Sequence, residues 1–246
     1  MLFNKIFYIN LNRRPERNKH IREQLKKISW KGPIERLPAV DGKYLKQKVV
    51  STYFTETAIA QSTTKHEQFI PGYYMTKGGM GCALSHRQIY LKIQKQKFDR
   101  VLILEDDVLL EPNFLEKLDS VSQYIPDDFD ILYLGYSESK SSTPVNEYIS
   151  KPTGVVFGTF AMVINKRVVP KLLSLFPLYA QIDSSISNLF SNIKAYHFHF
   201  DKRIIHHVPD PHLNTDVQTM EMYQYPIQNL WIVFVILFFL ALIFIF

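Results

Sequence analysis

The feature that most constrains this chain is a run of four branched aliphatic residues that leads directly into three carboxylates, within Arg100 to Val108. A short apolar run bounded by charge is typical of a buried strand of an α/β sheet. Such sheets bind ligands beyond the carboxyl ends of their strands. Glu105, Asp106 and Asp107 therefore occupy the position at which ligand chemistry is expected.

The three acids also need a partner. Adjacent carboxylates repel one another and raise one another's pKa values unless a cation or a basic cluster holds them ionised. Magnesium and manganese prefer hard oxygen ligands and take further ligands from water and from substrate phosphates. The acids thus predict a metal–diphosphate site. The alternative is a solvated turn in which one acid caps a helix entered at Pro112.

A basic segment follows the first predicted strand, Lys5 to Leu11. A proline suited to the first turn of a helix comes next, so Arg13 and Arg14 stand at a strand-to-helix turn. Guanidinium groups beside free helix amides bind diphosphates well, although arginines on a helix surface are an equally valid interpretation. A second predicted strand, Ile34 to Val40, runs into Asp41, which either belongs to a turn or binds a ribose.

Most remaining elements follow from hydrophobic periodicity and from turn residues. Three glycines before residue 82 permit close backbone approach to a ligand, and they open a helix that carries Cys82, Ser85 and His86. The other predicted elements are a partly helical excursion with a mobile loop (43–76), a helix (112–124), a strand (129–135), a surface loop (137–144), a β-like segment (154–164), a helix (167–175) and a strand (195–200).

Two later features leave alternatives open. Asp183 lies near the start of a further predicted helix, where a carboxylate can cap the helix or can serve as a base. Five histidines between residues 197 and 212 invite a metal interpretation. Their spacing matches no closed zinc site and no cysteine lies near them, so most are interpreted as structural or surface groups.

Composition predicts one α/β domain rather than two. The 246 residues suffice for a well-buried core, and no repeat or linker divides them. The net charge of +6 favours anionic ligands. The basic residues before position 50 largely share the polar side of one amphipathic helix, however, so nucleic acid is not an expected partner. The single cysteine, Cys82, forbids an intrachain disulfide.

The C-terminal residues differ in character from the rest. Residues 227–246 carry no charge and are mostly Ile, Leu, Phe and Val, and as a helix they would span about 30 Å, the thickness of a bilayer core. We expect a domain over residues 1–222 and a single-pass C-terminal membrane anchor over 223–246. The absence of a secretory signal and of Asn-x-Ser/Thr acceptors favours a cytosolic domain. An apolar helix docked on the domain is the alternative.

Five motifs occur in order along the chain: Phe7–Arg17, Ala39–Gly42, Gly81–His86, Leu104–Asp107 and Gly158–Ala161. Together they resemble glycosyltransferase family 25, which includes bacterial lipooligosaccharide galactosyltransferases and collagen hydroxylysine galactosyltransferases. The resemblance covers roughly residues 3 to 220. Each motif alone is weak, but five in this order are fairly specific.

The resemblance implies a single GT-A-like nucleotide-diphospho-sugar transferase domain with an open mixed α/β sheet. It also implies that the acidic strand end holds Mn²⁺ or Mg²⁺ on the donor, and that a hexose, usually galactose from UDP-galactose, is transferred with inversion. On this basis we predict Glu105 and Asp107 as metal ligands. The predicted nucleotide-sugar-binding residues are Asn12, Arg13, Arg14, Asp41, Ser85, His86 and Asp106. This chain has Gly79 where the family often has a glutamate.

We therefore predict a membrane-tethered transferase that moves a hexose from a UDP-sugar to a hydroxyl of a glycan, lipooligosaccharide or protein. Asp183 is the predicted base that takes the acceptor proton. Two rival functions remain. A metal-dependent phosphoryl-transfer enzyme would suit the acids alone, although the chain lacks a phosphate-loop signature. A catalytically silent, membrane-anchored adaptor would keep the fold and bind a partner through its basic N-terminal helix.

Overall fold

The computed structural model describes residues 2–63, 74–207 and 216. The elements of the first half are β1 (Lys5–Asn10), α1 (Pro15–Lys27), β2 (Ile34–Pro38), α2 (Gln47–Tyr53), α3 (Glu56–Thr63), α4 (Lys77–Lys95), β3 (Arg100–Glu105), β4 (Val108–Leu110) and α5 (Phe114–Ser120). Those of the second half are β5 (Ile131–Gly135), β6 (Glu138–Ser139), β7 (Ser142–Pro144), β8 (Ile149–Pro152), β9 (Val156–Phe157), β10 (Ala161–Asn165), α6 (Val169–Leu173), α7 (Ile182–Ser187), β11 (Ala195–Phe198) and β12 (Ile205–His207).

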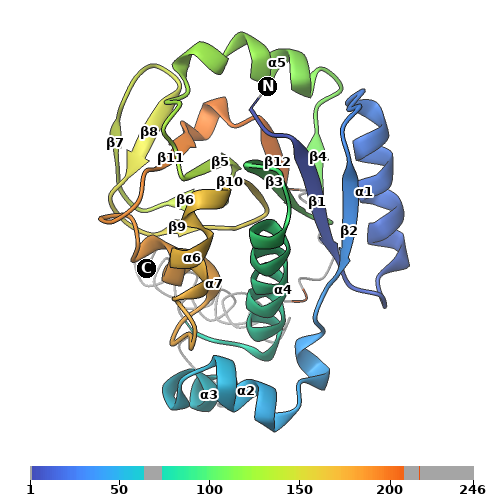
Figure 1. The fold of residues 1–246 in the computed structure, drawn as a ribbon, viewed down its shortest axis with the longest axis vertical. Coiled ribbons are helices and arrows are strands. Elements are labelled where there is room, and N and C mark those ends of the chain that lie inside the picture. Colours follow the sequence, from blue (N-terminus) through green and yellow to red (C-terminus); the bar gives the residue numbers. More distant parts are fainter. Residues whose placement is uncertain (1, 64–73, 208–215, 217–246) are drawn as a thin grey trace, which may run out of the picture.

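Eight of the strands form one mixed sheet in the order β2-β1-β3-β10-β5-β11-β8-β7 (Figure 1). β1 is parallel to both β2 and β3, so these three strands end at the same edge. β10 runs antiparallel to β3 and β5, and it therefore begins at the edge where β3 ends. The predicted α/β class and open mixed sheet are confirmed.

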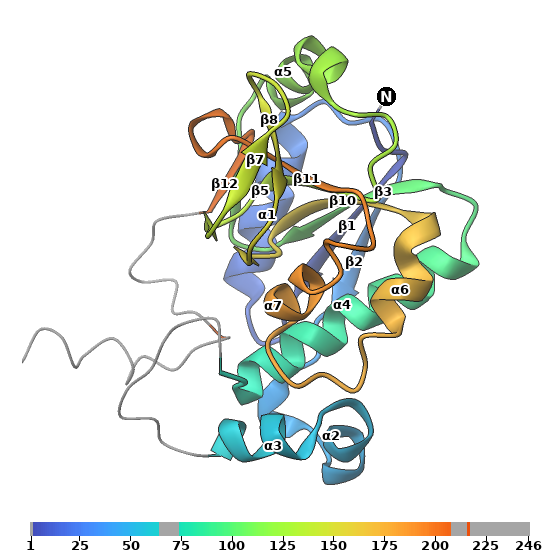
Figure 2. The ribbon, with the colours of Figure 1, turned by 90° about the vertical axis from the view of Figure 1, so that its left-hand side faces the viewer.

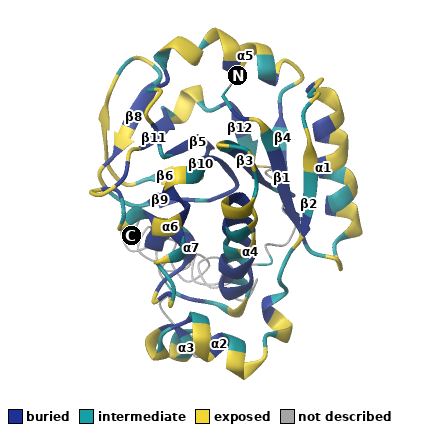
Figure 3. Ribbon diagram, in the orientation of Figure 1, coloured by how far each residue is buried: buried dark blue, intermediate teal, exposed yellow. Residues whose placement is uncertain are grey.

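β3 separates two apolar layers. Val101 and Ile103 belong to one layer and Leu102 and Leu104 to the other, as alternation along a strand requires, and all four are fully buried. α4, α6 and α7 cover the first face of the sheet, and α1 and α5 cover the second (Figure 2). α4 buries its face toward the sheet, whereas α1 and α5 expose their outer sides (Figure 3). Burial on both faces explains the unbroken apolar run in the sequence.

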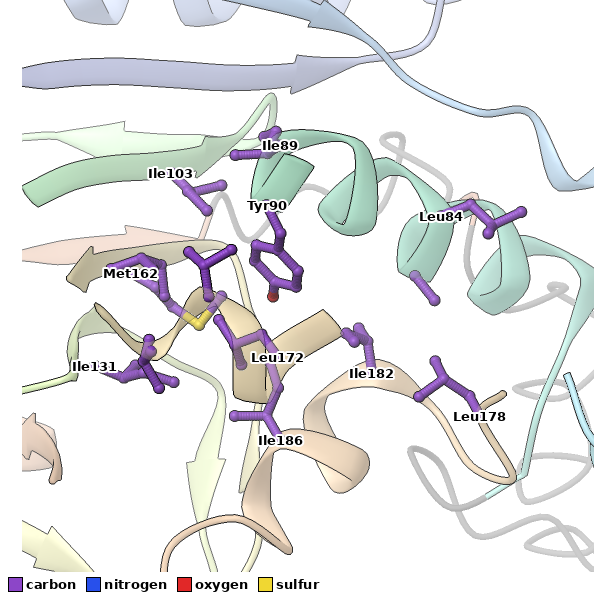
Figure 4. Packing of buried hydrophobic residues seen from close by; sticks show 14 of the residues in the cluster. Leu84, Ile89, Tyr90, Ile103, Ile131, Met162, Leu172, Leu178, Ile182 and Ile186 are labelled. Atoms are coloured by element: carbon purple, nitrogen blue, oxygen red, sulfur yellow. The ribbon is translucent and has the colours of Figure 1, made fainter. Parts of the chain in front are cut away.

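The layer under α4 is closely filled. Tyr90 of α4 extends into it beside Met162 and Leu172 (Figure 4), and all three are fully buried. Burying each such side chain contributes about 1.5–3 kcal/mol. The core thus fixes α4, and with it Cys82 and His86, against the strand that carries the acids.

Three predicted segments differ from the structure. The predicted loop at 137–144 is wrong, since β6 and β7 lie within it. The β-like segment at 154–164 is interrupted between β9 and β10 at Gly158, whose φ of +92° suits glycine. The acids are followed by β4 rather than by a helix, and no side-chain hydrogen bond caps α5, so the helix-cap alternative for the acids is wrong.

The predicted excursion at 43–76 contains α2 and α3, while its residues 64–73 lie outside the described part of the chain. The predicted membrane anchor, 223–246, lies outside it as well. Within the residues that the structure describes, no helix is both long and apolar enough to cross a bilayer. The anchor therefore stays a prediction from sequence.

Candidate active site

A cavity opens where the parallel strands end. Ile9 pairs with Glu105 and Asn10 with Pro38, so the segments that leave β1, β2 and β3 lie side by side. The cavity has a volume of about 140 Å³, enough for several small polar groups or waters at about 10–15 Å³ each. The polar and ionisable groups in its walls include Asn10, Arg13, Arg17, Asp41, Cys82, Ser85, Glu105, Asp106, Asp107, His207 and Asp216.

Glu105 lies on the side of the cavity toward α4. Its Oε1 accepts a hydrogen bond of 2.9 Å from the hydroxyl of Thr159, which precedes β10 by two residues. The same oxygen is 3.5 Å from Nε2 of His86, a side chain with no exposed surface. The antiparallel pairing of β10 with β3 brings Thr159 here, and sequence patterning gave no sign of that long-range contact.

Asp106 and Asp107 turn toward α1 instead. Asn10 donates a hydrogen bond of 2.6 Å to Oδ2 of Asp106. Arg17 Nη1 lies 3.3 Å from Oδ1 of Asp106 and 3.3 Å from Oδ2 of Asp107, so one guanidinium bridges both carboxylates. His207 Nε2 is 3.1 Å from Oδ2 of Asp107. The acidic run thus has the basic partners that its sequence required.

The two aspartates differ in acidity because their partners differ. Burial raises the pKa of Asp106 to about 6, against the opposing effect of the Asn10 hydrogen bond. Burial acts in the same direction on Asp107, but the hydrogen bond and charge of His207 and the charge of Arg17 hold the pKa of that carboxyl below its ordinary value. Of these two aspartates, Asp107 is therefore the one that stays ionised more readily.

Arg17 and His207 are the site residues that sequence reasoning missed. Arg17 is only 5% exposed, although its basic neighbours predict a solvated helix face. It precedes the buried Ile21 by four residues and Leu25 by eight, so helical spacing places it on the buried face of α1. His207 reaches Asp107 through the pairing of β12 with β4, two three-residue strands whose periodicity is too short to detect.

Arg13 stands at the mouth of the cavity. Its Nε donates to Oδ2 of Asp41 at 2.6 Å, and its Nη2 lies 2.7 Å from Oδ1 of Asp216. Arg14 Nη1 is 3.3 Å from the other oxygen of Asp216. Arg17 lies 3.9 Å from that second oxygen, so a single carboxylate sits among three guanidinium groups. Arg13 and Arg14 both lie at the predicted strand-to-helix turn, where they pair with carboxylates of the chain itself.

The structure brings some predicted donor-binding residues to the cavity and leaves others beside it. The predicted residues that line the cavity are Arg13, Asp41, Ser85 and Asp106, together with the acids Glu105 and Asp107. Asn12, Arg14 and His86 are not among the residues that line it. The side chain of Asn12 accepts a hydrogen bond from the side chain of Arg36. The hydroxyl of Ser85 accepts from the Val40 amide, so Ser85 also holds the local backbone.

The three glycines predicted to open this helix lie in the first two turns of α4, and one of them allows close packing of the helix rather than close approach of a ligand. A Cβ on Gly81 would come within 2.5 Å of the Val40 carbonyl, and one on Gly42 would come within 1.7 Å of the Lys77 carbonyl. The helix and the 40–42 segment can thus pack this closely because both residues lack side chains. Gly78 does line the cavity.

Asp183 lies in the first turn of α7 and outside the cavity lining. Its Oδ1 accepts from the Ser184 amide at 2.7 Å and its Oδ2 from the Gly158 amide at 3.3 Å. Burial raises its pKa to about 6, the two amides lower it, and the charge of Glu105 raises it. Gly158 is followed by Thr159, whose hydroxyl donates to Glu105 in the cavity wall. The Asp183 carboxylate is therefore connected to the cavity wall through two adjacent residues.

Two sets of groups can hold a cation. Oδ1 of Asp107 is buried and has no hydrogen-bond partner among the residues the structure describes, which leaves a hard oxygen available beside His207. This orphaned oxygen fits Mn²⁺ or Mg²⁺. Separately, Cys82, His86 and Glu105 each present a ligand atom, and these atoms all lie within 4.8 Å of one another.

An open mixed α/β sheet with acids and arginines around a cavity at its strand ends is the arrangement expected of a GT-A-like glycosyltransferase. The chain belongs to glycosyltransferase family 25. The profile of that family, described as "Glycosyltransferase family 25 (LPS biosynthesis protein)", matches residues 3–186. The predicted family membership is confirmed.

Several curated relatives carry the family name. A Drosophila melanogaster "Glycosyltransferase 25 family member" is 33% identical over 191 residues, which cover 71% of this chain and 28% of that protein. "Procollagen galactosyltransferase 1" of Danio rerio is 28% identical over 82% of this chain and 34% of its own length. A "Probable inactive glycosyltransferase 25 family member 3" of Bos taurus is 28% identical, covering 72% and 30%. The chain therefore matches about a third of the length of these relatives.

Among solved structures, the glycosyltransferase GlyE of Streptococcus pneumoniae superposes with a TM-score of 0.46 at 10% identity, covering 85% of this chain and 55% of GlyE. A glycosyltransferase involved in glycosylation of the major capsid of PBCV-1 superposes with a TM-score of 0.42 at 10% identity, covering 84% and 93%.

Proposed function

We propose that this chain is a metal-dependent hexosyltransferase that moves a sugar, galactose from UDP-galactose foremost, to a hydroxyl of a glycan, lipooligosaccharide or protein. Family membership and the galactosyltransferase names of relatives support the reaction class. The observation that carries the proposal is one cavity whose walls combine carboxylates for a cation with arginines for a diphosphate.

The basic groups around the cavity suit the leaving diphosphate. The side chain of Arg13 is 43% exposed, so it can change position as a donor binds. The side chain of Arg17 is 6% exposed and is held in place. A guanidinium fork donates two hydrogen bonds to a phosphate. Both arginines now hold carboxylates, and a diphosphate that enters would take the place of Asp216 among them.

The acids suit the cation that such a donor brings. Asp107, with its unpartnered Oδ1 and with His207 beside it, and Glu105 across the cavity are the residues that would hold Mn²⁺ or Mg²⁺. When bound, the ion supplies positive charge against the negative charge that builds on the diphosphate. Asp106 accepts a hydrogen bond from Asn10 and pairs with Arg17. These contacts order the turn that contains Asp107.

Asp183 is the proposed base toward the acceptor hydroxyl. Each of its oxygens accepts one backbone amide, which fixes the carboxylate and leaves further lone pairs for a proton. A pKa of about 6 is close to the operating pH, as efficient proton transfer requires. Attack by the acceptor oxygen on the sugar carbon would then pass the hydroxyl proton to Asp183 as the bond to the diphosphate breaks.

The proposal also includes attachment to a membrane through residues 227–246 with the domain in the cytosol. The attachment rests on the uncharged apolar run, and the cytosolic placement rests on the lack of Asn-x-Ser/Thr acceptors in the sequence. Protease added to intact microsomes should digest the domain, whereas protection would place the domain in the lumen.

A donor screen tests the reaction. Nucleotide release from a panel of sugar nucleotides is measured with Mn²⁺, then with a chelator, for the natural chain, for Asp107→Asn and for the exposed control Asp201→Asn. We expect release from UDP-galactose that the chelator abolishes, that falls at least about 100-fold in Asp107→Asn and that the control keeps. Binding without release would identify a silent adaptor. Phosphate release without sugar transfer would identify a phosphoryl-transfer enzyme.

A further inference from the structure

Cys82 and His86 form one side of a small cluster of metal-ligating groups. They are four residues apart in α4, so they share a face of that helix. Glu105 faces them from the end of β3, and the three ligand atoms lie within 4.8 Å of one another. These groups offer one sulfur, one nitrogen and one oxygen, a set that suits Zn²⁺ or Co²⁺ better than Mn²⁺ or Mg²⁺.

The distances within the cluster fit ligands that share one ion better than they fit a direct hydrogen bond between His86 and Glu105. His86 Nε2 and Glu105 Oε1 are 3.5 Å apart, beyond the 2.7–3.2 Å of an ordinary hydrogen bond. Ligand atoms held at about 2.0–2.3 Å in a tetrahedron stand about 3.3–3.8 Å apart. The nitrogen–oxygen pair already has this separation, and the thiol needs to move by roughly 1 Å at most, within reach of a side-chain rotation.

The surroundings of the cluster suit a bound cation. His86 has no exposed surface, and its Nδ1 has no partner among the residues the structure describes. The Thr159 hydroxyl donates to Glu105 and so orients one of the three ligands. Cys82 and Glu105 line the cavity, which gives an ion a path to the cluster and leaves room for a water as fourth ligand.

We propose that Cys82, His86 and Glu105 bind one thiophilic divalent cation of the Zn²⁺ class, at a site distinct from the Asp107–His207 side of the cavity. The thiol releases its proton to solvent on binding. A thiolate and a carboxylate then balance the double positive charge, and neutral imidazole completes the protein ligands. This balance makes the ion acceptable in a largely buried position.

Glu105 belongs both to this cluster and to the proposed Mn²⁺ site, so a cation bound to the cluster affects turnover. This consequence rests on the proposed transferase function. A cation held through sulfur withdraws the Glu105 carboxylate from the donor side of the cavity. Zn²⁺ outcompetes Mn²⁺ for nitrogen and sulfur ligands. Zn²⁺ therefore inhibits Mn²⁺-dependent transfer through Cys82, and excess Mn²⁺ does not readily reverse the inhibition.

Cobalt binding to the metal-free 246-residue chain tests the site without any assay of activity. We expect a thiolate-to-cobalt charge-transfer band and the visible bands of a tetrahedral ion, both saturating at one ion per chain. Because Cys82 is the single cysteine, the charge-transfer band can arise only from it. Zn²⁺ should bleach the spectrum, and Mn²⁺ at the same concentration should not.

Variants and thiol protection complete the test. Cys82→Ser should abolish the band and His86→Gln should weaken cobalt binding by at least about 100-fold, whereas the control His206→Ala, a half-buried histidine outside the cluster, should bind as the natural chain does. Zn²⁺ should also slow alkylation of Cys82 in the natural chain, a measurement that does not depend on the folding of any variant. No charge-transfer band, or a band unchanged in a folded His86→Gln variant, would overturn the site.

The inhibition is measured as the ratio of transfer rates with and without Zn²⁺ in each protein. A ratio that falls in the natural chain and not in Cys82→Ser supports competition for Glu105, and equal ratios refute it. A cobalt band in a chain that transfers no sugar from any donor would retain the metal site and reject the proposed function, so the two failures are distinguishable.

Discussion

Replacing Asp183 by Asn distinguishes two roles of this residue, that of a catalytic base and that of a helix cap. The amide keeps the size of the carboxyl and can accept from the Ser184 or the Gly158 amide, but it cannot take a proton from an acceptor hydroxyl. Turnover should fall by about 10² to 10⁴. In the natural chain the rate should rise with pH through about 6, where Asp183 becomes ionised, and the residual rate of the variant should lose that limb.

The same variant has a calculable effect on stability. The pKa of Asp183 is about 6 in the folded chain against an ordinary 3.8, so the folded state binds the proton more tightly than the unfolded state between these values. Stability of the natural chain therefore falls as pH rises through this window. At 1.36 kcal/mol per pKa unit the loss is about 3 kcal/mol. The neutral amide has no such loss, because it resembles the protonated acid at every pH.

Urea or thermal unfolding at pH 4 and at pH 8 measures this difference. The two proteins should be about equally stable at pH 4, and Asp183→Asn should be more stable at pH 8 by about 3 kcal/mol, or roughly 6–12 °C in Tm. Asp201→Asn, on an exposed residue, should show no such crossover. A variant that transfers sugar at near the natural rate would refute the base. Parallel stability curves would refute the raised pKa.

Three further changes test the surroundings of the site. Gly158→Ala puts a Cβ at φ +92° and within 2.9 Å of a backbone amide, so it should lower stability by more than about 1 kcal/mol in urea unfolding and should disturb Asp183. Arg17→Met leaves two buried carboxylates without their shared cation and should cost about 3–5 kcal/mol in the same assay. Asp107→Asn should keep the circular dichroism spectrum while calorimetry detects no Mn²⁺-dependent UDP binding.

The part of the fold that sequence predicts best is the sheet around β3. Four aliphatics followed by acids can form a strand buried on both faces, and parallel strands must end at one edge, so the cavity position follows from Arg100–Glu105 and Lys5–Asn10 alone. Arg13 and Asp41 could be assigned to that edge because each directly follows a predicted strand.

The contacts that were not predicted join segments far apart in the chain. His207 meets Asp107 through a pairing of two three-residue strands, and Thr159 meets Glu105 because β10 runs antiparallel to β3. Neither contact leaves a periodic signal, since pairing partners are chosen by the tertiary fold. The burial of Arg17 could have been read from its helical spacing, but a basic residue among basic neighbours favoured a solvated face.

The most direct test of a metal-dependent UDP-sugar transferase is thermal unfolding of the chain with UDP alone, Mn²⁺ alone and both together. We predict that both together raise Tm well beyond the sum of the separate effects, because Asp107 and the arginines bind the diphosphate and its cation jointly. Ligand at about 100 times its Kd adds about 2.7 kcal/mol of stability. No increase in Tm with UDP and Mn²⁺ together would contradict the proposed donor site.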